Sequence, residues 1–164
     1  MNLRYRQATE HDLDLYHGWA NDPAVRAQSF NQGAIPYDTH CAWFRRRVAA
    51  TDGLMLVFEE AGSGEPVGQV RFEDGPEHAT VGLSIAASQR GKGLAAEMLS
   101  QATAEFQRRH PVRGVRAQIR LENTASRRAF EKAGYNLVGQ ELVAGVPSVV
   151  FEHRPAGIPL SPNS

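Results

Sequence analysis

The chain has 164 residues, 41% of them hydrophobic, and its 18 lysines and arginines are matched by 18 aspartates and glutamates. This length fits one ordinary domain, and the zero net charge argues against the basic excess of proteins that bind nucleic acids or membrane surfaces. We therefore expect neither a nucleic-acid nor a membrane partner. The single cysteine, Cys41, and the lack of a signal-peptide or membrane-spanning stretch predict a cytoplasmic protein.

The first fifty residues predict one strand and two helices. Alternating apolar and polar residues over 3–8 favour a strand, and the helical pattern that follows ends before Asn-Asp-Pro at 21–23. We interpret residues 24–37 as a loop or a broken helix. Asp38 or Thr39 is then predicted to cap the second helix.

The middle of the chain has the pattern of an antiparallel sheet. Three strand-like runs, 54–60, 66–74 and 78–86, are separated by turns short enough to favour a meander. Apolar residues at a spacing of four then predict a long helix over 94–109, before a strand at 114–121.

The last part of the chain predicts a helix and two strands. The helix covers 123–133, with Gly134 at its C-terminal cap, and the strands cover 135–142 and 146–153. The exposed edges of these last strands would allow a homodimer.

The order of these elements defines the fold class. A strand–helix–strand crossover around residues 80–120 requires parallel pairing inside an otherwise antiparallel sheet. The predicted fold is α+β, with a mixed, mostly antiparallel sheet of about six or seven strands flanked by about four helices. Residues 1–154 are predicted to form a single domain, and residues 155–164, rich in proline and small polar residues, a flexible tail.

The stretch SQRGKGLA, residues 88–95, lies where a strand gives way to a helix. Gly91 and Gly93 permit positive φ or close approach of a ligand, and the free amides of a helix N-terminus bind anions. The pattern is neither G-x-x-x-x-G-K-[ST] nor G-x-G-x-x-G. On local sequence alone, a phosphate-binding turn and a plain basic glycine turn remain equal alternatives.

Two sequence motifs, about thirty residues apart, favour the phosphate-binding turn over the plain glycine turn. RGKGLA at 90–95 fits [R/Q]-x-x-G-x-[G/A], and LENTASRRAFEKAGY at 121–135 has the spacing N-x-x-S-x-x-x-[Y/F]-x-x-x-G-[F/Y]. With this order of elements, residues 3–153 closely resemble the GNAT superfamily of acetyl-CoA-dependent N-acetyltransferases. The resemblance implies acetyl-CoA as the donor, no metal, and direct transfer of acetyl to a primary amine.

The resemblance also implies a set of donor-binding residues. Backbone amides of Arg90 through Ala95 would hold the CoA pyrophosphate, and the end of the preceding strand would pair with the pantetheine arm. Asn123 would contact that arm, with a purely capping role as the alternative. The implied set is Leu83, Ser84, Ile85, Arg90, Gly91, Lys92, Gly93, Leu94, Ala95, Asn123, Ser126, Arg127 and Phe130.

The two usual acid–base positions of the family are empty in this chain. Phe130 stands where many members have a tyrosine acid, Thr80 stands where many have a glutamate, and Tyr135 is expected to face the core. Catalysis could therefore rest mainly on proximity and on a backbone N–H near residues 83–85 that polarises the carbonyl. The candidate catalytic residues are Glu73, His78 and Ser84, and His40 is a further candidate base.

Residues 16–44 correspond to the variable acceptor region of the family. The skeleton W-x-N-D-P-x-V-R, followed by an isoleucine and H-x-x-[WF], resembles members that acetylate nucleotide-linked amino sugars. The acceptor is thus expected to be a small-molecule amine, and a nucleotide sugar is the specific hypothesis. The candidate acceptor-binding residues are Arg26, Phe30, Asn31 and His40.

Three other readings remain open. One is an N-terminal acetyltransferase of the ribosomal-protein type, and another is a CoA-binding module without catalysis. An aminoglycoside acceptor is disfavoured, because Arg26 and the arginines at 45–47 give the early helices few acids to meet a polycation.

Overall fold

The structure is a computed structural model that describes residues 1–155. Apart from Pro155, the predicted tail lies outside the described residues. Seven described strands form one sheet in the order β1-β2-β3-β4-β5-β7-β6. Their bounds are β1 Leu3–Gln7, β2 Leu54–Glu60, β3 Pro66–Glu73, β4 Ala79–Ile85, β5 Val115–Arg120, β6 Asn136–Val143 and β7 Val146–His153.

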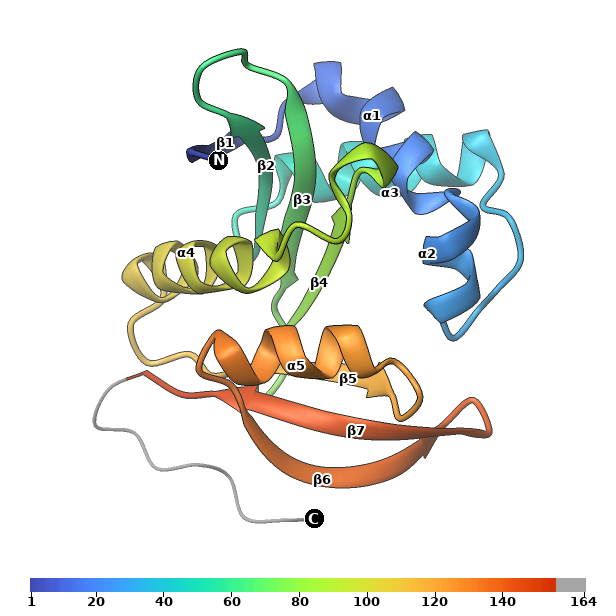
Figure 1. Ribbon diagram of the computed structural model, residues 1–164, viewed down its shortest axis with the longest axis vertical. Helices are drawn as coiled ribbons and strands as arrows, with labels where there is room; N and C mark the ends of the chain where they lie inside the picture. Colours follow the sequence, from blue (N-terminus) through green and yellow to red (C-terminus); the bar gives the residue numbers. More distant parts are fainter. Residues whose placement is uncertain (156–164) are drawn as a thin grey trace.

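Five α-helices flank the sheet within the described part of the chain. They are α1 Leu13–Ala20, α2 Pro23–Gln28, α3 Tyr37–Ala49, α4 Leu94–Arg109 and α5 Thr124–Lys132, and short 3₁₀ turns cover Glu10–Asp12 and Ala87–Gln89. Figure 1 shows α4 and α5 side by side, apart from the group formed by α1, α2 and α3. The predicted α+β class with a mixed, mostly antiparallel sheet is confirmed.

Two apolar layers hold the helices on the sheet. The larger layer packs α4 and α5 on one face, where the rings of Phe72 and Phe106 stack with centroids 4.6 Å apart. The smaller layer packs α1 and α3 on the other face, around Tyr16, Trp19 and Phe44. Because successive side chains of a strand point to opposite faces, β2 supplies alternate residues to both layers, whereas the apolar residues of β3 belong to the larger layer.

The helical region before residue 50 refines the prediction in one place and differs from it in another. Residues 24–37, expected to be a loop or a broken helix, begin with the short helix α2, because the Asp22 side chain caps it at Ala24 and Pro23 occupies its first position. The next helix begins at Tyr37, with Pro36 at its N-cap, rather than at a cap on residue 38 or 39.

The feature that creates the site is the separation of β4 from β5. These strands are parallel, and their pairing is limited to Ala79 with Val115 and Thr80 with Arg116. Every other strand pair is antiparallel and covers at least five residue pairs. Beyond Thr80 the two central strands therefore diverge, and a gap opens in the middle of the sheet.

Candidate active site

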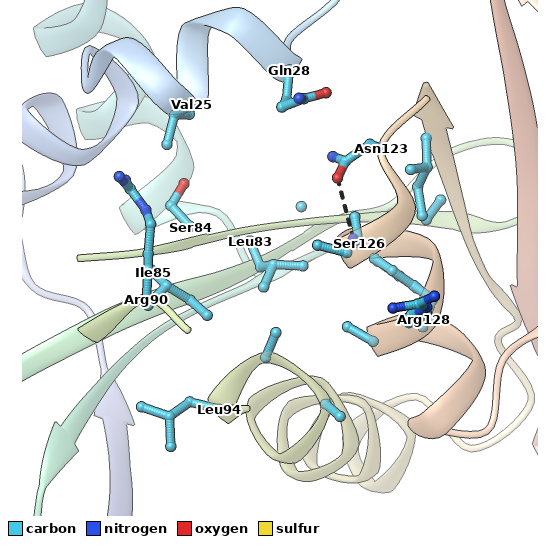
Figure 2. A pocket seen from close by; sticks show the side chains of 18 of the residues that line it. Val25, Gln28, Leu83, Ser84, Ile85, Arg90, Leu94, Asn123, Ser126 and Arg128 are labelled. Atoms are coloured by element: carbon cyan, nitrogen blue, oxygen red, sulfur yellow. Dashed lines mark hydrogen bonds between the residues drawn. The ribbon is translucent and has the colours of Figure 1, made fainter. Parts of the chain in front are cut away.

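A cavity of about 640 Å³, called the donor cleft below, lies where β4 and β5 separate. Figure 2 shows β4, the start of α4 and α5 around it, with Val25 and Gln28 of α2 across the opening. Eleven of the thirteen predicted donor-binding residues line it: Leu83, Ser84, Ile85, Arg90, Gly91, Gly93, Leu94, Ala95, Asn123, Ser126 and Phe130. Lys92 and Arg127 are not among the lining residues.

The backbone of β4 presents unpaired polar groups to the donor cleft. The amide of Ala79 donates to Gly114 next to β5, whereas the amide of Ala86 donates to Val67 next to β3. Because strand residues alternate in this direction, the N–H and C=O groups of Leu83 and Ile85 point toward β5. No described strand pairs with that edge of β4 beyond Thr80, so an extended ligand could hydrogen-bond there as an additional strand.

The glycine-rich loop has the conformation of an anion-binding turn. Gly91 and Gly93 have φ values of 76° and 72°, and an added Cβ at either one would meet nothing within 4 Å. No side chain caps α4, whose first amides therefore lack intrahelical partners. Free amides and the positive end of the helix dipole thus converge on an open space.

The two cations of this loop are held by the protein. Arg90 forms a 2.9 Å ion pair with Asp22, and the Lys92 ammonium donates to the Gln89 side chain at 3.0 Å. Arg90 therefore links the donor loop to α2, which lies across the cleft. Because both side chains have partners, the backbone amides are the groups of this loop that remain available to a ligand.

The wall formed by α5 differs in detail from the prediction. Asn123 caps the helix, with its Oδ1 accepting from the Ser126 amide at 3.2 Å, and it also lines the cleft, so the two expected roles are compatible. Arg127 instead donates to the Leu121 carbonyl at 3.0 Å. Arg128 and Lys132, which sequence reasoning missed, line the cleft one helical turn apart.

Phe130 and Tyr135 belong to the core that closes the cleft. Phe130 is 2% exposed and meets Tyr135 edge-on at 4.9 Å, so the family's usual tyrosine position carries no proton donor here. The Tyr135 hydroxyl shares a 2.7 Å hydrogen bond with Thr103, and burial raises its pKa above the ordinary value for tyrosine. Tyr135 does not line either cavity.

Tyr135→Phe should therefore leave kcat within about 3-fold of the wild type while lowering stability by about 1–3 kcal/mol, since Thr103 loses its buried partner. Thiol-release kinetics at pH 7 and urea unfolding test the two parts. A 100-fold loss of kcat with unchanged stability would instead identify Tyr135 as a catalytic acid.

A second cavity of about 650 Å³, called the acceptor cavity below, lies between the sheet and helices α1–α3. It shares five lining residues with the donor cleft: Val25, Ser29, Gly82, Leu83 and Ser84. The two cavities therefore meet at β4. The other residues that line the acceptor cavity are Tyr16, Ala20, Arg26, Ile35, Thr39, His40, Ala42, Trp43, Arg46, Gln69, Arg71 and Glu73.

The floor of the acceptor cavity is polar. On β3, Gln69, Arg71 and Glu73 alternate with Val70 and Phe72, which enter the core under α4. Gln69 pairs across the sheet with Ser84, and the Gln69 side-chain amide donates a 3.1 Å hydrogen bond to the Ser84 hydroxyl. The Gln69 Oε1 has no hydrogen-bond partner among the described residues. Sequence reasoning missed Gln69 and Arg71, although alternation in the predicted strand places both opposite the core.

The three candidate catalytic residues do not form one group. Ser84 and Glu73 both line the acceptor cavity. Glu73 pairs with Thr80, so it lies about 13 Å along β4 from Ser84, and its carboxylate is 3.9 Å from Arg47. His78 lines neither cavity, because it precedes the closed end of β4; burial lowers its pKa, with nearby Arg116 adding to the effect.

Two of the four candidate acceptor-binding residues reach the acceptor cavity. Arg26 lines it while donating to the carbonyls of Ala20, Asn31 and Gly33 and to the Ser29 hydroxyl. His40 is 2% exposed, and its Nε2 lies 2.8 Å from the Leu13 carbonyl. Burial lowers the pKa of His40, which favours the neutral ring with its Nε2 proton donated to that carbonyl.

Phe30 and Asn31 lie in the loop after α2 and line neither cavity. The Asn31 side chain accepts from the Gly33 amide, and its carbonyl accepts from Arg26. In this structure both residues therefore belong to the loop that Arg26 organises.

The comparisons with known proteins agree with this fold. The family described as "Acetyltransferase (GNAT) domain" matches residues 2–136. The chain therefore belongs to the GNAT acetyltransferase family, which confirms the expected class, an enzyme that transfers acetyl groups. A comparison with curated proteins found no match.

Solved structures share the fold at low sequence identity. Spermidine N-acetyltransferase from Vibrio cholerae, solved with CoA and spermine, gives a TM-score of 0.83 at 16% identity over 94% of this chain and 96% of that one. Aminoglycoside acetyltransferase AAC(6')-Ib with coenzyme A gives 0.76 at 19% identity, over 93% and 95%. The protein yncA from Salmonella typhimurium, solved with acetyl-CoA as its cofactor, gives 0.78 at 20% identity, over 95% of both chains.

Among the described helices, none combines the length and apolarity needed to cross a bilayer. Within residues 1–155, no three His, Cys, Asp or Glu side chains come together as a metal site would require.

Proposed function

We propose that this protein transfers acetyl from acetyl-CoA, bound in the donor cleft, to a primary amine bound in the acceptor cavity. The observation that carries the proposal is that the two cavities meet along Gly82, Leu83 and Ser84. A thioester and an amine entering from opposite sides would meet there directly. This arrangement supports transfer in one step, without an acetylated enzyme.

The residues of the donor cleft fit a CoA molecule. Open, positive-φ glycines at 91 and 93 let a diphosphate approach the amides at the start of α4, and the free edge of β4 offers hydrogen bonds to an amide-containing arm. Arg128 and Lys132 add positive charge to the α5 wall. When bound, acetyl-CoA supplies an activated acyl group whose thiolate is a good leaving group.

The residues that line the junction of the two cavities determine how the amine could lose its proton. A free alkylamine with a pKa near 10.4 is neutral in roughly one molecule in 10³ at pH 7, so deprotonation has to be assisted or the acceptor pKa has to be lower. Ser84 accepts from Gln69, which leaves its own hydroxyl hydrogen free to donate. Glu73 lies too far along the strand for direct contact at Ser84 and would accept the amine proton through water.

No tyrosine hydroxyl lines the donor cleft among the described residues. A thiol with a pKa near 8.5 can leave as the thiolate near neutral pH without a proton donor. The amide of Leu83 or Ile85, on the free edge of β4, is placed to polarise the thioester carbonyl. Catalysis would then depend mainly on positioning.

We propose a nucleotide-linked amino sugar as the acceptor. The W-x-N-D-P-x-V-R skeleton supports this choice, since its asparagine holds a lining residue of the acceptor cavity and its arginine lines that cavity directly. The Asn21 side chain accepts from the amide of Ile35, and both Ile35 and Arg26 are lining residues. A cavity of about 650 Å³ with aromatic and arginine side chains in its lining suits a ligand of that size.

The test is CoA release by the wild type with four acceptors: a UDP-linked amino sugar, an N-terminal peptide, spermidine and an aminoglycoside. We expect the amino sugar to be acetylated with the highest kcat/KM. Acetylation of the peptide alone would establish the N-terminal alternative. Tight acetyl-CoA binding without transfer to any amine would establish a CoA-binding module.

A further inference from the structure

Arg71 lies on the floor of the acceptor cavity with its polar groups unused. Its guanidinium makes no hydrogen bond and no ion pair with any of the residues that the structure describes. An arginine carries five N–H donors in a planar fork that matches a carboxylate or a phosphate. Burial lowers the pKa of Arg71, yet a guanidinium remains protonated in proteins, so this charge lies partly buried without a partner.

The surroundings hold the Arg71 guanidinium in place without neutralising it. The Trp43 ring lies 5.7 Å from its central carbon, a cation–π contact that leaves the N–H groups free. On the other side, a Cβ at Gly82 would come within 3.0–3.1 Å of the guanidinium. The glycine at this position of β4 therefore makes room for the Arg71 side chain between α3 and the sheet.

No carboxylate around the acceptor cavity forms an ion pair with Arg71 among the described residues, and the charge of Glu73 acts on it only at a distance. Arg26 is bound by carbonyls and a hydroxyl, which leave its positive charge uncompensated, and Arg46 also lines the cavity. Glu73 is the one carboxylate among the lining residues, and it lies 3.9 Å from Arg47. The described lining thus has three arginines against one glutamate, a balance that repels a polycation and attracts an anion.

We infer that Arg71 binds an anionic group of the acceptor, so that the substrates are amines that also carry a phosphate or a carboxylate. This inference rests on the proposed function, since it assigns a role within the same acceptor cavity. Arg71 pairs with Gly82, two residues from Ser84, so the anion would lie roughly 7 Å from the junction of the cavities. Binding there would orient the amine toward the thioester and exclude spermidine-like acceptors.

The experiment measures binding to the CoA-saturated protein by calorimetry, which keeps phosphates out of the donor cleft and requires no turnover. The first pair of probes is glucosamine 1-phosphate and glucosamine, and the second is β-alanine and β-alanine amide. Each pair differs in one anionic group, so the comparison separates phosphate from carboxylate recognition. The proteins are the wild type, Arg71→Met, Arg71→Lys and the control Arg45→Met, which removes an exposed charge from α3 without touching either cavity.

We expect the anionic member of at least one pair to bind the wild type and Arg45→Met at least about 10-fold more tightly than its neutral partner, as a bidentate charged contact implies. Arg71→Met should abolish that ratio, Arg71→Lys should restore part of it, and both should bind CoA as the wild type does. Equal binding within both pairs, or a ratio that survives Arg71→Met, would overturn the inference. If the Arg71-dependent preference for the anionic probe were observed but no acetyl transfer occurred, the result would count against the proposed function and not against this inference.

Discussion

Replacing Gly93 with tryptophan is expected to weaken acetyl-CoA binding at least about 100-fold, a loss of about 2.7 kcal/mol. Gly93 has a φ of 72° at the N-cap of α4, where nothing lies within 4 Å of an added Cβ. The indole would project into the space that we assign to the diphosphate, and the left-handed backbone would be strained. Both effects remove the shape on which the anion site depends.

The matched control for this change is Gly145→Trp. Gly145 lies in the turn between β6 and β7, has a φ of 78°, and also has nothing within 4 Å of an added Cβ. The control therefore carries the same backbone strain and the same added ring, away from both cavities. Calorimetric titration with acetyl-CoA should give wild-type affinity for Gly145→Trp. Undiminished affinity in Gly93→Trp would disprove the assignment of the loop.

Gly82→Val is expected to lower kcat/KM for the acceptor at least about 100-fold while changing acetyl-CoA affinity by less than about 5-fold. Gly82 lines both cavities, and a Cβ there would press on the Arg71 guanidinium. Valine would therefore narrow the junction and displace Arg71. The amides assigned to the diphosphate lie at the far end of the donor cleft and would be unaffected. Valine is also a favourable residue for a strand, so β4 should still form.

Gly139→Val provides the control for this second change. Gly139 is in β6, with nothing within 4 Å of an added Cβ, and it lines neither cavity. Steady-state CoA release should separate the two variants. If Gly82→Val turned over like the wild type, the amine would have to reach the thioester by another route.

Regular, local patterns were enough to predict most of the fold. The apolar spacing in α4 and the continuous apolar run in β2, bounded by short turns, predicted both elements closely. The six residues of α2 are too few for a helical period, and the Asp22–Pro23 pair that begins it was interpreted only as the end of the preceding helix. Its place across the donor cleft is marked by the Arg90–Asp22 ion pair, which joins segments distant in sequence.

The donor cleft was more predictable than the acceptor cavity for a similar reason. The glycine loop and Asn123 act through backbone geometry that is encoded locally. One step along α5 turns a side chain by about 100°, so the sequence motif alone did not separate Arg127 from Arg128. The role of Arg71 was hidden because it depends on Trp43 and Gly82, which only the folded chain brings beside it.

A crystal structure of the protein with acetyl-CoA would test the central claim most directly. We predict density for the diphosphate at the amides of residues 91–95, and an acyl-bearing arm hydrogen-bonded to Leu83 and Ile85, with the thioester open to the acceptor cavity. Density for the ligand outside the gap between β4 and β5, or a thioester closed off from the acceptor cavity, would contradict the account.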